Sequence, residues 1–147
     1  KLYKYLNDMI RIVDNDTIIF YEPCTGGNDL DATPCGFDTG PGGDDYDDKQ
    51  SLSYHIYCPL IQTDVPITND TIFNQTLLDA CYELNDLQWY WRLDDTKRLK
   101  TAGFLTEFGA VPYTGLGWKL IDYEGDMADD NLVSWTYWYL NMDSERD

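Results

Sequence analysis

A carboxylate stands at the end of a strand-like run in the second half of the sequence. Glu107 follows Phe104-Leu105-Thr106 and precedes Phe108-Gly109. In parallel α/β enzymes, catalytic side chains are displayed at the C-terminal ends of strands. Glu107 is therefore a candidate catalytic residue. The pattern alone is unspecific, because such a Glu can also cap a neighbouring helix.

Three further segments have the composition of strands: residues 18–23, 52–59 and 133–138. In the second of them His55 and Tyr57 alternate, so their side chains leave the same face of a strand. If that face meets Glu107, the Tyr57 hydroxyl can hydrogen-bond the carboxylate and hold it ionised and aimed. His55 is then placed to touch a substrate hydroxyl or to tune the acid. A lone histidine in a β-rich chain is, however, more often structural.

The intervals between the strand-like runs have room for crossover helices, which predicts β/α units and a parallel sheet. A helix should precede the first strand, because apolar residues recur at helical spacing at Leu2, Leu6, Met9, Ile10 and Val13. A longer helix is predicted over 71–99, with Asn69 or Thr71 as its cap and an apolar face at Phe73, Leu77, Cys81, Leu84, Leu87 and Trp91. In this helix, core packing rather than sugar binding is expected of Trp89, Tyr90 and Trp91.

Three motifs in these segments occur in the same order as in one known family. They are Tyr-His-x-Tyr at 54–57, Leu-Thr-Glu-Phe-Gly at 105–109 and Ser-Trp-x-Tyr-Trp at 134–138. On these motifs the sequence resembles the endoglycosylceramidases of glycoside hydrolase family five, which are (β/α)8 TIM barrels that release an intact oligosaccharide from a glycosphingolipid. The resemblance implies an α/β fold in which residues 1–147 supply strands five to eight, the C-terminal half of the catalytic barrel.

The resemblance also implies a partner. A whole barrel takes typically about 250 residues, and the second half of its strands alone would leave open sheet edges. We therefore expect the N-terminal half of the same barrel, as a separate chain or a removed segment, to complete the fold.

The implied chemistry is that of a retaining glycoside hydrolase, in which one carboxylate is the nucleophile and a second carboxyl group is the general acid. By resemblance Glu107 is the nucleophile, and His55 and Tyr57 complete the catalytic group. The family's general acid lies in an Asn-Glu-Pro motif, which is absent here. Glu22, in Tyr-Glu-Pro at 21–23, is assigned to the lining of the substrate pocket, with acid catalysis as the less favoured role. The general acid is expected from the missing half.

Aromatic residues supply the other expected contacts to a glycosphingolipid or a related β-glycoside. Trp138 resembles the family's strand-eight tryptophan, which supports the sugar at the cleavage position. Its rival, Trp135, should lie on the opposite face of the strand, because the two residues are an odd number of positions apart. Tyr113 and Trp118, in an apolar and glycine-containing stretch, are candidates for a groove that binds the ceramide.

The net charge of −17 and the sequence pI near 4.1 argue against nucleic acid as a partner, because phosphate binding requires a basic surface. The acidic cluster at 44–48 is interpreted as a solvated loop, since the ligand spacing of an EF-hand calcium site is absent. No apolar run is long enough to span a bilayer. Neither a metal nor a cofactor is expected.

The cysteines are Cys24, Cys35, Cys58 and Cys81. Disulfides are the better interpretation than zinc. Short loop closures favour Cys24 with Cys35 and Cys58 with Cys81, although the sequence leaves all pairings open. Asn-x-Thr sequons begin at Asn15, Asn69 and Asn74. Together these features predict a protein that is secreted or resides in the lumen of the secretory or lysosomal pathway.

Two functions of different classes fit these observations. The first is the glycosidase, acting once its other half is bound. The second is a non-catalytic assembly protein, such as a component of an extracellular coat or filament, derived from the same scaffold. Retention of Tyr57, Glu107 and Trp138 favours the first, because a structural role requires none of them. A small acidic binding module unrelated to barrels would leave the ordered motifs unexplained.

Overall fold

The computed structural model describes residues 1–23, 33–61 and 73–138. Its elements in chain order are α1 (Leu2–Arg11), β1 (Ile19–Tyr21), the 3-10 helix η1 (Asp44–Lys49), β2 (Gln50–His55), α2 (Gln75–Leu99), β3 (Ala102–Glu107), α3 (Gly115–Asp130) and β4 (Ser134–Trp135). The predicted strands and helices are therefore all present, although β1 and β4 are shorter than the runs that predicted them.

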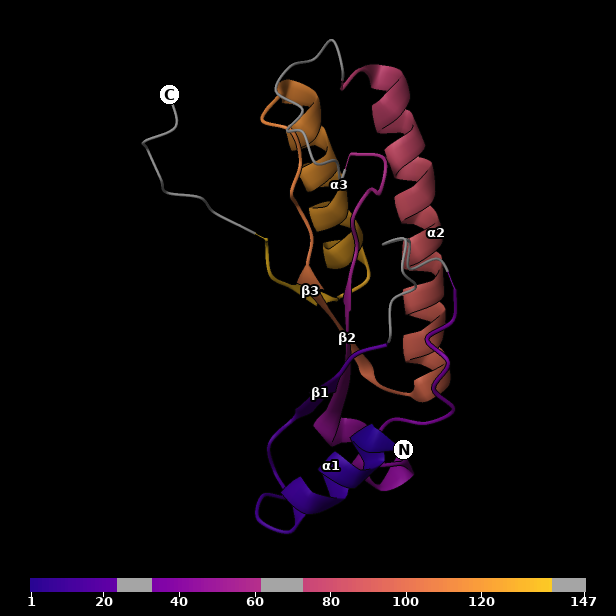
Figure 1. Ribbon diagram of the computed structural model, residues 1–147, viewed down its shortest axis with the longest axis vertical. Coiled ribbons are helices and arrows are strands. Elements are labelled where there is room, and N and C mark those ends of the chain that lie inside the picture. The colour runs from indigo at the N-terminus through magenta and orange to yellow at the C-terminus, as the bar shows by residue number, and fades with distance from the viewer. Residues whose placement is uncertain (24–32, 62–72, 139–147) are drawn as a thin grey trace, which may run out of the picture.

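The strands form one parallel sheet in the order β1-β2-β3-β4. Each strand pairs with the next one along the chain, and α2 and α3 are the connections between β2, β3 and β4. Figure 1 shows α2 and α3 side by side along the sheet, with α1 at its other end. Sequential parallel strands with helices in the crossovers are the architecture of a (β/α)8 barrel segment, as the sequence predicts.

The main core lies between the sheet and the helices α2 and α3. One face of the strands contributes buried side chains that pack with Trp89 of α2 and Ala128 of α3: Tyr21, Leu52, Tyr54 and Leu105. The other face carries Phe20 and Phe104, whose rings lie 5.4 Å apart. Phe20 is 51% exposed, so this second face of the sheet is open to solvent near β1.

The buried face of α2 differs from the apolar stripe that the sequence predicts. Leu87 of that stripe is 42% exposed, and Tyr90, expected in the core, is 60% exposed, whereas Trp89 is buried as predicted. Consecutive helical residues point about 100° apart, so Trp89 and Tyr90 cannot both face the core. Half of the buried positions of α2 are polar and paired with other polar groups, which is why hydrophobicity alone selects the wrong face: Leu78, Cys81, Asn85, Gln88, Trp89, Arg92, Asp95 and Leu99.

The start of α2 also corrects a prediction. The helix begins at Gln75, and its cap is Asn74, whose side-chain oxygen accepts a hydrogen bond from the Leu77 N–H at 3.1 Å. The caps that we expected, Asn69 and Thr71, lie outside the described residues.

Helix α1 is present where the sequence predicts it, but its apolar stripe is turned outward. Leu2 is 67% exposed and Met9 is 49% exposed. The buried side chains are those of Asn7 and Arg11. Arg11 donates hydrogen bonds to the main-chain oxygens of Thr17 and Lys49, both at 2.8 Å, and these bonds fix the polar side of the helix against the chain.

One predicted disulfide is present, between Cys58 after β2 and Cys81 in α2. The expected partner bridge is wrong in this structure, because Cys35 is a free thiol; Cys24 lies outside the described residues. The Cys35 N–H donates to a carboxylate oxygen of Asp95 at 2.9 Å, which holds this loop against α2 without a covalent bond. Burial raises the pKa of the Cys35 thiol, so it stays in its less reactive protonated form.

The predicted sequons fall in different settings. Asn15 accepts a hydrogen bond from the Tyr46 hydroxyl at 3.3 Å, Asn74 caps α2, and Asn69 lies outside the described residues. In the described part of the chain, no helix is both long and apolar enough to cross a membrane.

Candidate active site

The candidate catalytic residues meet at the C-terminal ends of β2 and β3. The Tyr57 hydroxyl donates a hydrogen bond to Glu107 Oε2 at 3.0 Å. His55 Nδ1 lies 3.3 Å from the same oxygen. The structure therefore brings together the residues that the sequence places on two separate strands.

An irregularity of the sheet makes this meeting possible. Tyr54 pairs with Leu105, but the next residue, His55, pairs with Glu107, so Thr106 is an extra residue in β3. With regular alternation from buried Leu105, Glu107 would face the helices. The one-residue shift returns its side chain to the face that carries His55, which is the usual effect of a bulge near a functional site. The Thr106 hydroxyl donates to the Tyr54 main-chain oxygen at 3.1 Å and fastens the irregular segment.

Glu22, which follows β1, joins the group from the other side. His55 Nε2 lies 3.4 Å from Glu22 Oε1, so the imidazole lies between the carboxylates of Glu22 and Glu107. The sequence predicted Glu22 as a pocket residue, and the structure places it against the histidine.

The electrostatics of Tyr57 suit a hydrogen-bond donor. Burial raises the pKa of its phenol well above the usual value, and the hydrogen bond to Glu107 raises the pKa further. The hydroxyl therefore keeps its proton at every physiological pH and can donate a hydrogen bond to the Glu107 carboxylate. The site is partly open, because 30% of the Glu107 side chain and 29% of the His55 side chain are exposed.

Gly109 brings the end of β3 close to the segment after β4. Its φ of 120° lies in the region that favours glycine, and a Cβ there would lie 2.4 Å from the Trp138 main-chain oxygen. This oxygen accepts a hydrogen bond from the Ala110 N–H at 3.1 Å, and the Trp138 N–H donates to Phe108 at 2.8 Å. The backbone conformation and this close approach therefore require glycine at the last position of the Glu-Phe-Gly motif.

The tryptophans after β3 are separated by an irregular segment. Strand β4 ends at Trp135, and Trp138 pairs with Gly109 only through an isolated bridge. The alternation argument for opposite faces therefore does not apply, because it needs a regular strand. The Trp135 ring lies edge-on to Phe108 at 5.4 Å, and 49% of Trp138 is exposed. The sugar-binding role of Trp138 stays a prediction.

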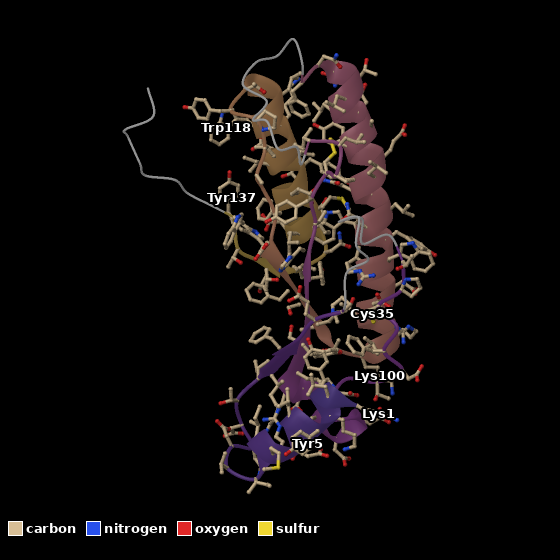
Figure 2. All side chains as sticks on the ribbon, in the orientation of Figure 1. Lys1, Tyr5, Cys35, Lys100, Trp118 and Tyr137 are labelled. Atoms are coloured by element: carbon tan, nitrogen blue, oxygen red, sulfur yellow. A yellow bond between two sulfur atoms is a disulfide. The ribbon has the colours of Figure 1, made fainter. Side chains whose placement is uncertain are left out.

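Tyr113 and Trp118 form a pair of their own at the N-terminal end of α3. Their rings lie 6.1 Å apart, and they are 87% and 54% exposed. Figure 2 shows Trp118 beside this end of the helix and Tyr137 further along the chain. Among the described residues, no contact joins either ring to Glu107, so the structure does not bring these predicted ceramide contacts into the catalytic group.

A set of polar residues behind the site was missed by sequence reasoning. Asn85 and Gln88 of α2 and Glu124 of α3 are buried between the helices and the end of β2. Gln88 Nε2 donates a hydrogen bond to the Tyr57 main-chain oxygen at 2.9 Å. The available signal was the pair of amides at helical spacing in α2, but exposed amides show the same spacing. Within the described ranges, no group of three or more His, Cys, Asp or Glu side chains is arranged to hold a metal ion.

Comparison with known proteins gives the relatives of this chain. No protein-family model matches the sequence. Endoglycoceramidases from Cyanea nozakii and Hydra vulgaris are 32% and 33% identical to it over 136 residues, which cover 92% of this chain. This chain is a homologue of the endoglycoceramidases. The alignments cover 22% and 21% of the two relatives, so the chain spans about a fifth of their length.

Solved structures give the same relation for the fold. Endo-glycoceramidase II from Rhodococcus sp., in a five-membered iminocyclitol complex, superposes with a TM-score of 0.69 at 21% identity over 92% of this chain and 29% of that one. The same enzyme in a ganglioside GM3 complex gives a TM-score of 0.68 at 19% identity, with the same coverage. An endoglucanase gives 0.61 at 17% identity over 95% of this chain and 46% of its own. The endoglycoceramidase homologue thus has the predicted fold, part of a (β/α)8 barrel.

Proposed function

We propose that this chain forms the C-terminal half of the catalytic barrel of a retaining glycoside hydrolase of the endoglycoceramidase type. The observation that carries the proposal is the Glu107 carboxylate at the end of a central strand, held by the Tyr57 hydroxyl at 3.0 Å and by His55 at 3.3 Å. An assembly protein has no need of a carboxylate that a sheet irregularity and a half-buried phenol aim together.

In the proposed reaction Glu107 is the nucleophile. Its carboxylate bonds to the anomeric carbon as the bond to the leaving oxygen breaks, and a general acid gives that oxygen a proton. Water then attacks the anomeric carbon of the glycosyl-enzyme as the bond to Glu107 breaks and its carboxylate is released, and the same group, now a base, takes the proton of the water. The Tyr57 donor aims the Glu107 carboxylate before attack, and Trp138 supports the sugar ring.

The general acid is assigned to the N-terminal half of the barrel. Glu22 is 3.4 Å from His55 and shares that histidine with the nucleophile, which suits a residue that orients the imidazole and lines the pocket. The surfaces that this half would cover are visible: the apolar stripe of α1, represented by Leu2 at 67% exposure, and the open face at Phe20. Solvent-exposed apolar surfaces of this kind mark contacts with other chain segments.

The proposed substrate is an oligosaccharide linked to ceramide, or a related β-glycoside. The support is the homology to endoglycoceramidases and the fold shared with an endoglycoceramidase in a ganglioside GM3 complex. Tyr113 and Trp118 form an exposed aromatic pair at the N-terminal end of α3, which suits contact with a lipid. The Cys58–Cys81 disulfide supports a secreted or lumenal location, because disulfides persist in oxidising compartments.

The test is covalent labelling of the complete protein that carries this chain. A 2-fluoro glycoside with an activated leaving group needs no general acid to form the glycosyl-enzyme, and the fluorine slows its hydrolysis. We expect one sugar mass on the peptide that contains Glu107, and none on the folded Glu107→Gln variant. A label on another carboxylate, or a folded protein that takes no label, would contradict the proposal.

A further inference from the structure

A chain of buried hydrogen bonds runs from α3 through α2 to the end of β2, behind the candidate active site. The Asn85 side-chain amide donates to Glu124 Oε1, and Gln88 Nε2 lies 3.2 Å from Asn85 Oδ1, to which it donates. The same Gln88 nitrogen donates to the Tyr57 main-chain oxygen at 2.9 Å. Trp89 Nε1 donates to the other oxygen of Glu124 at 2.7 Å. The side chains of this network are 2% exposed or less.

The ends of the network fix the direction of every amide in it. A main-chain oxygen only accepts, so Gln88 must present its nitrogen to Tyr57. The Asn85 atom that meets this nitrogen must then be its oxygen, and the Asn85 nitrogen must point to an acceptor. The Glu124 carboxyl group supplies that acceptor, and it accepts from Trp89 as well. The Tyr57 oxygen at one end and Glu124 at the other therefore set the orientation of the whole network.

The orientation is kept although it leaves one atom unsatisfied. Among the described residues, the buried Oε1 of Gln88 has no hydrogen-bond partner. A buried unpaired acceptor costs free energy, but rotating the amide would turn this oxygen toward the Tyr57 oxygen, which also only accepts. The bond to the Tyr57 oxygen is therefore kept at the cost of the unpaired Oε1.

The network ends at Tyr57, directly after the main-chain pairing between β2 and β3 ends. In the described part of the chain, the last main-chain hydrogen bond between the ends of β2 and β3 is donated by the Ile56 N–H to the Glu107 oxygen at 3.1 Å. Tyr57 follows it directly, and in the described part of the chain Gln88 is the partner of its main-chain oxygen. The Tyr57 side chain in turn donates to Glu107 at 3.0 Å. A shift of this one residue would move the donor off the carboxylate.

We propose that Gln88, Asn85 and Glu124 are positioning residues for the candidate nucleophile: together they hold the Tyr57 main chain and thereby aim its hydroxyl at Glu107. This inference rests on the proposed function for its effect on catalysis. The positioning itself is a property of the folded chain and is measurable without turnover.

The kinetic test uses the complete protein and the variant Gln88→Leu. Loss of the bond to Tyr57 should lower kcat for the activated glycoside about tenfold while KM stays within about twofold, because positioning acts on the chemical step. In a Tyr57→Phe background the same change should lower kcat by less than about twofold, because its effect passes through the hydroxyl that is already absent. Equal losses in both backgrounds would overturn the proposal.

A matched control separates positioning from general destabilisation. Gln50, at the other end of β2, is also buried and binds main-chain groups, accepting from Gly42 N–H at 3.0 Å and donating to Gly43 O at 3.2 Å. Gln50→Leu should lower thermal stability by an amount similar to Gln88→Leu and leave kcat per folded molecule unchanged. A control variant that loses as much kcat as Gln88→Leu would also overturn the proposal.

A spectroscopic measurement keeps the inference separate from the proposed function. With tyrosine labelled at Cζ by carbon-13, the Tyr57 signal is assigned by its absence in Tyr57→Phe. In Gln88→Leu and Glu124→Gln the chemical shift of the Tyr57 Cζ should change as its bond to Glu107 weakens, while Gln50→Leu leaves it unchanged. This result in a protein without glycosidase activity would support the network and refute the proposed function. An unchanged Tyr57 signal in an active enzyme would do the reverse.

Discussion

Helix α2 buries polar side chains in two places, and it pairs them in two different ways. In its middle, the amides of Asn85 and Gln88 form a directed chain of hydrogen bonds that ends at Tyr57. Two turns further on, Arg92 and Asp95 are fully buried and form an ion pair at 3.2 Å. The first set consists of amides with fixed donors and acceptors, and the second of opposite charges.

The second set anchors a loop rather than a site. Asp95 accepts from the Cys35 N–H at 2.9 Å and from Arg98 at 2.7 Å, and Arg98 donates to the Phe37 main-chain oxygen at 2.5 Å. Cys35 lies beside the C-terminal half of α2, and Tyr137 lies on the other side of the sheet region (Figure 2). We propose that a buried polar group on this helix either positions the candidate nucleophile or stabilises a loop, according to the strand or loop that it touches.

The largest effect on kcat is expected at Glu107, the carboxylate that the first set of α2 residues supports through Tyr57. Glu107→Gln should lower kcat by about 10⁴-fold or more, because removal of a nucleophile abolishes the covalent step. The free energy of unfolding should change by less than about 1 kcal/mol, since the side chain is partly exposed. Steady-state kinetics and urea unfolding of the complete protein measure the two quantities. Activity near that of the wild type would remove Glu107 from the mechanism.

Asp95 should show the opposite behaviour. Asp95→Ala takes the carboxylate away from buried Arg92, and loss of one partner of a buried ion pair costs about 3–5 kcal/mol of stability. Once folded, the protein should keep its kcat, because Asp95 contacts the loop of Cys35 and not the site. Urea unfolding and active-site titration by the fluorinated glycoside separate these effects. A folded variant with a strongly reduced kcat would show that the two regions are coupled.

The pH dependence of stability should report on Glu124. Burial raises the pKa of this carboxyl group from 4.5 to about 7. Between these values the folded protein holds a proton that the unfolded chain has released, so the free energy of unfolding falls as the pH rises, by about 3 kcal/mol in total. Glu124→Gln should remove this slope between about pH 4.5 and 7. Asp126→Asn, an exposed change on the same helix, should retain it, and a slope that survives in Glu124→Gln would contradict the assignment.

Tyr57 tests the face of β2 that meets the site. Tyr57→Phe should lower kcat by about 10- to 100-fold, because Glu107 loses a hydrogen-bond donor worth about 1.5–3 kcal/mol to a charged group. The matched control is Tyr54→Phe on the helix side of the same strand, where the hydroxyl is buried without a hydrogen-bond partner in the described part of the chain. It should leave kcat unchanged and stability equal or slightly higher. Equal kinetic losses in both variants would mean that strand packing, not the hydroxyl, sets the rate.

The sequence predicts some parts of the fold and of the candidate site and misses others. Strands, crossover helices and the meeting of His55, Tyr57 and Glu107 follow from short-range patterns and from motifs in order. The irregularity at Thr106 does not, because alternation predicts the wrong face for Glu107, and only the pairing with β2 reveals the extra residue. The buried face of α2 was predicted only in part, through Cys81, since Gln88 looks like a solvent-exposed residue until its partner after β2 is known.

The smallest effect is expected at the start of α2, where one residue has two assignments. Asn74 caps the helix through the Leu77 N–H and also begins a sequon. Asn74→Ala should cost about 1 kcal/mol of stability, because the N–H loses its acceptor, whereas Asn74→Ser keeps an acceptor and should cost only a few tenths of that. Both variants remove the sequon, so a glycan at Asn74 would be missing equally from the masses of both. Equal losses of stability in the two variants would therefore point to the glycan, and a loss confined to Asn74→Ala would establish the cap. In both variants kcat should be unchanged, because neither the Tyr57 network nor the Asp95 loop is touched.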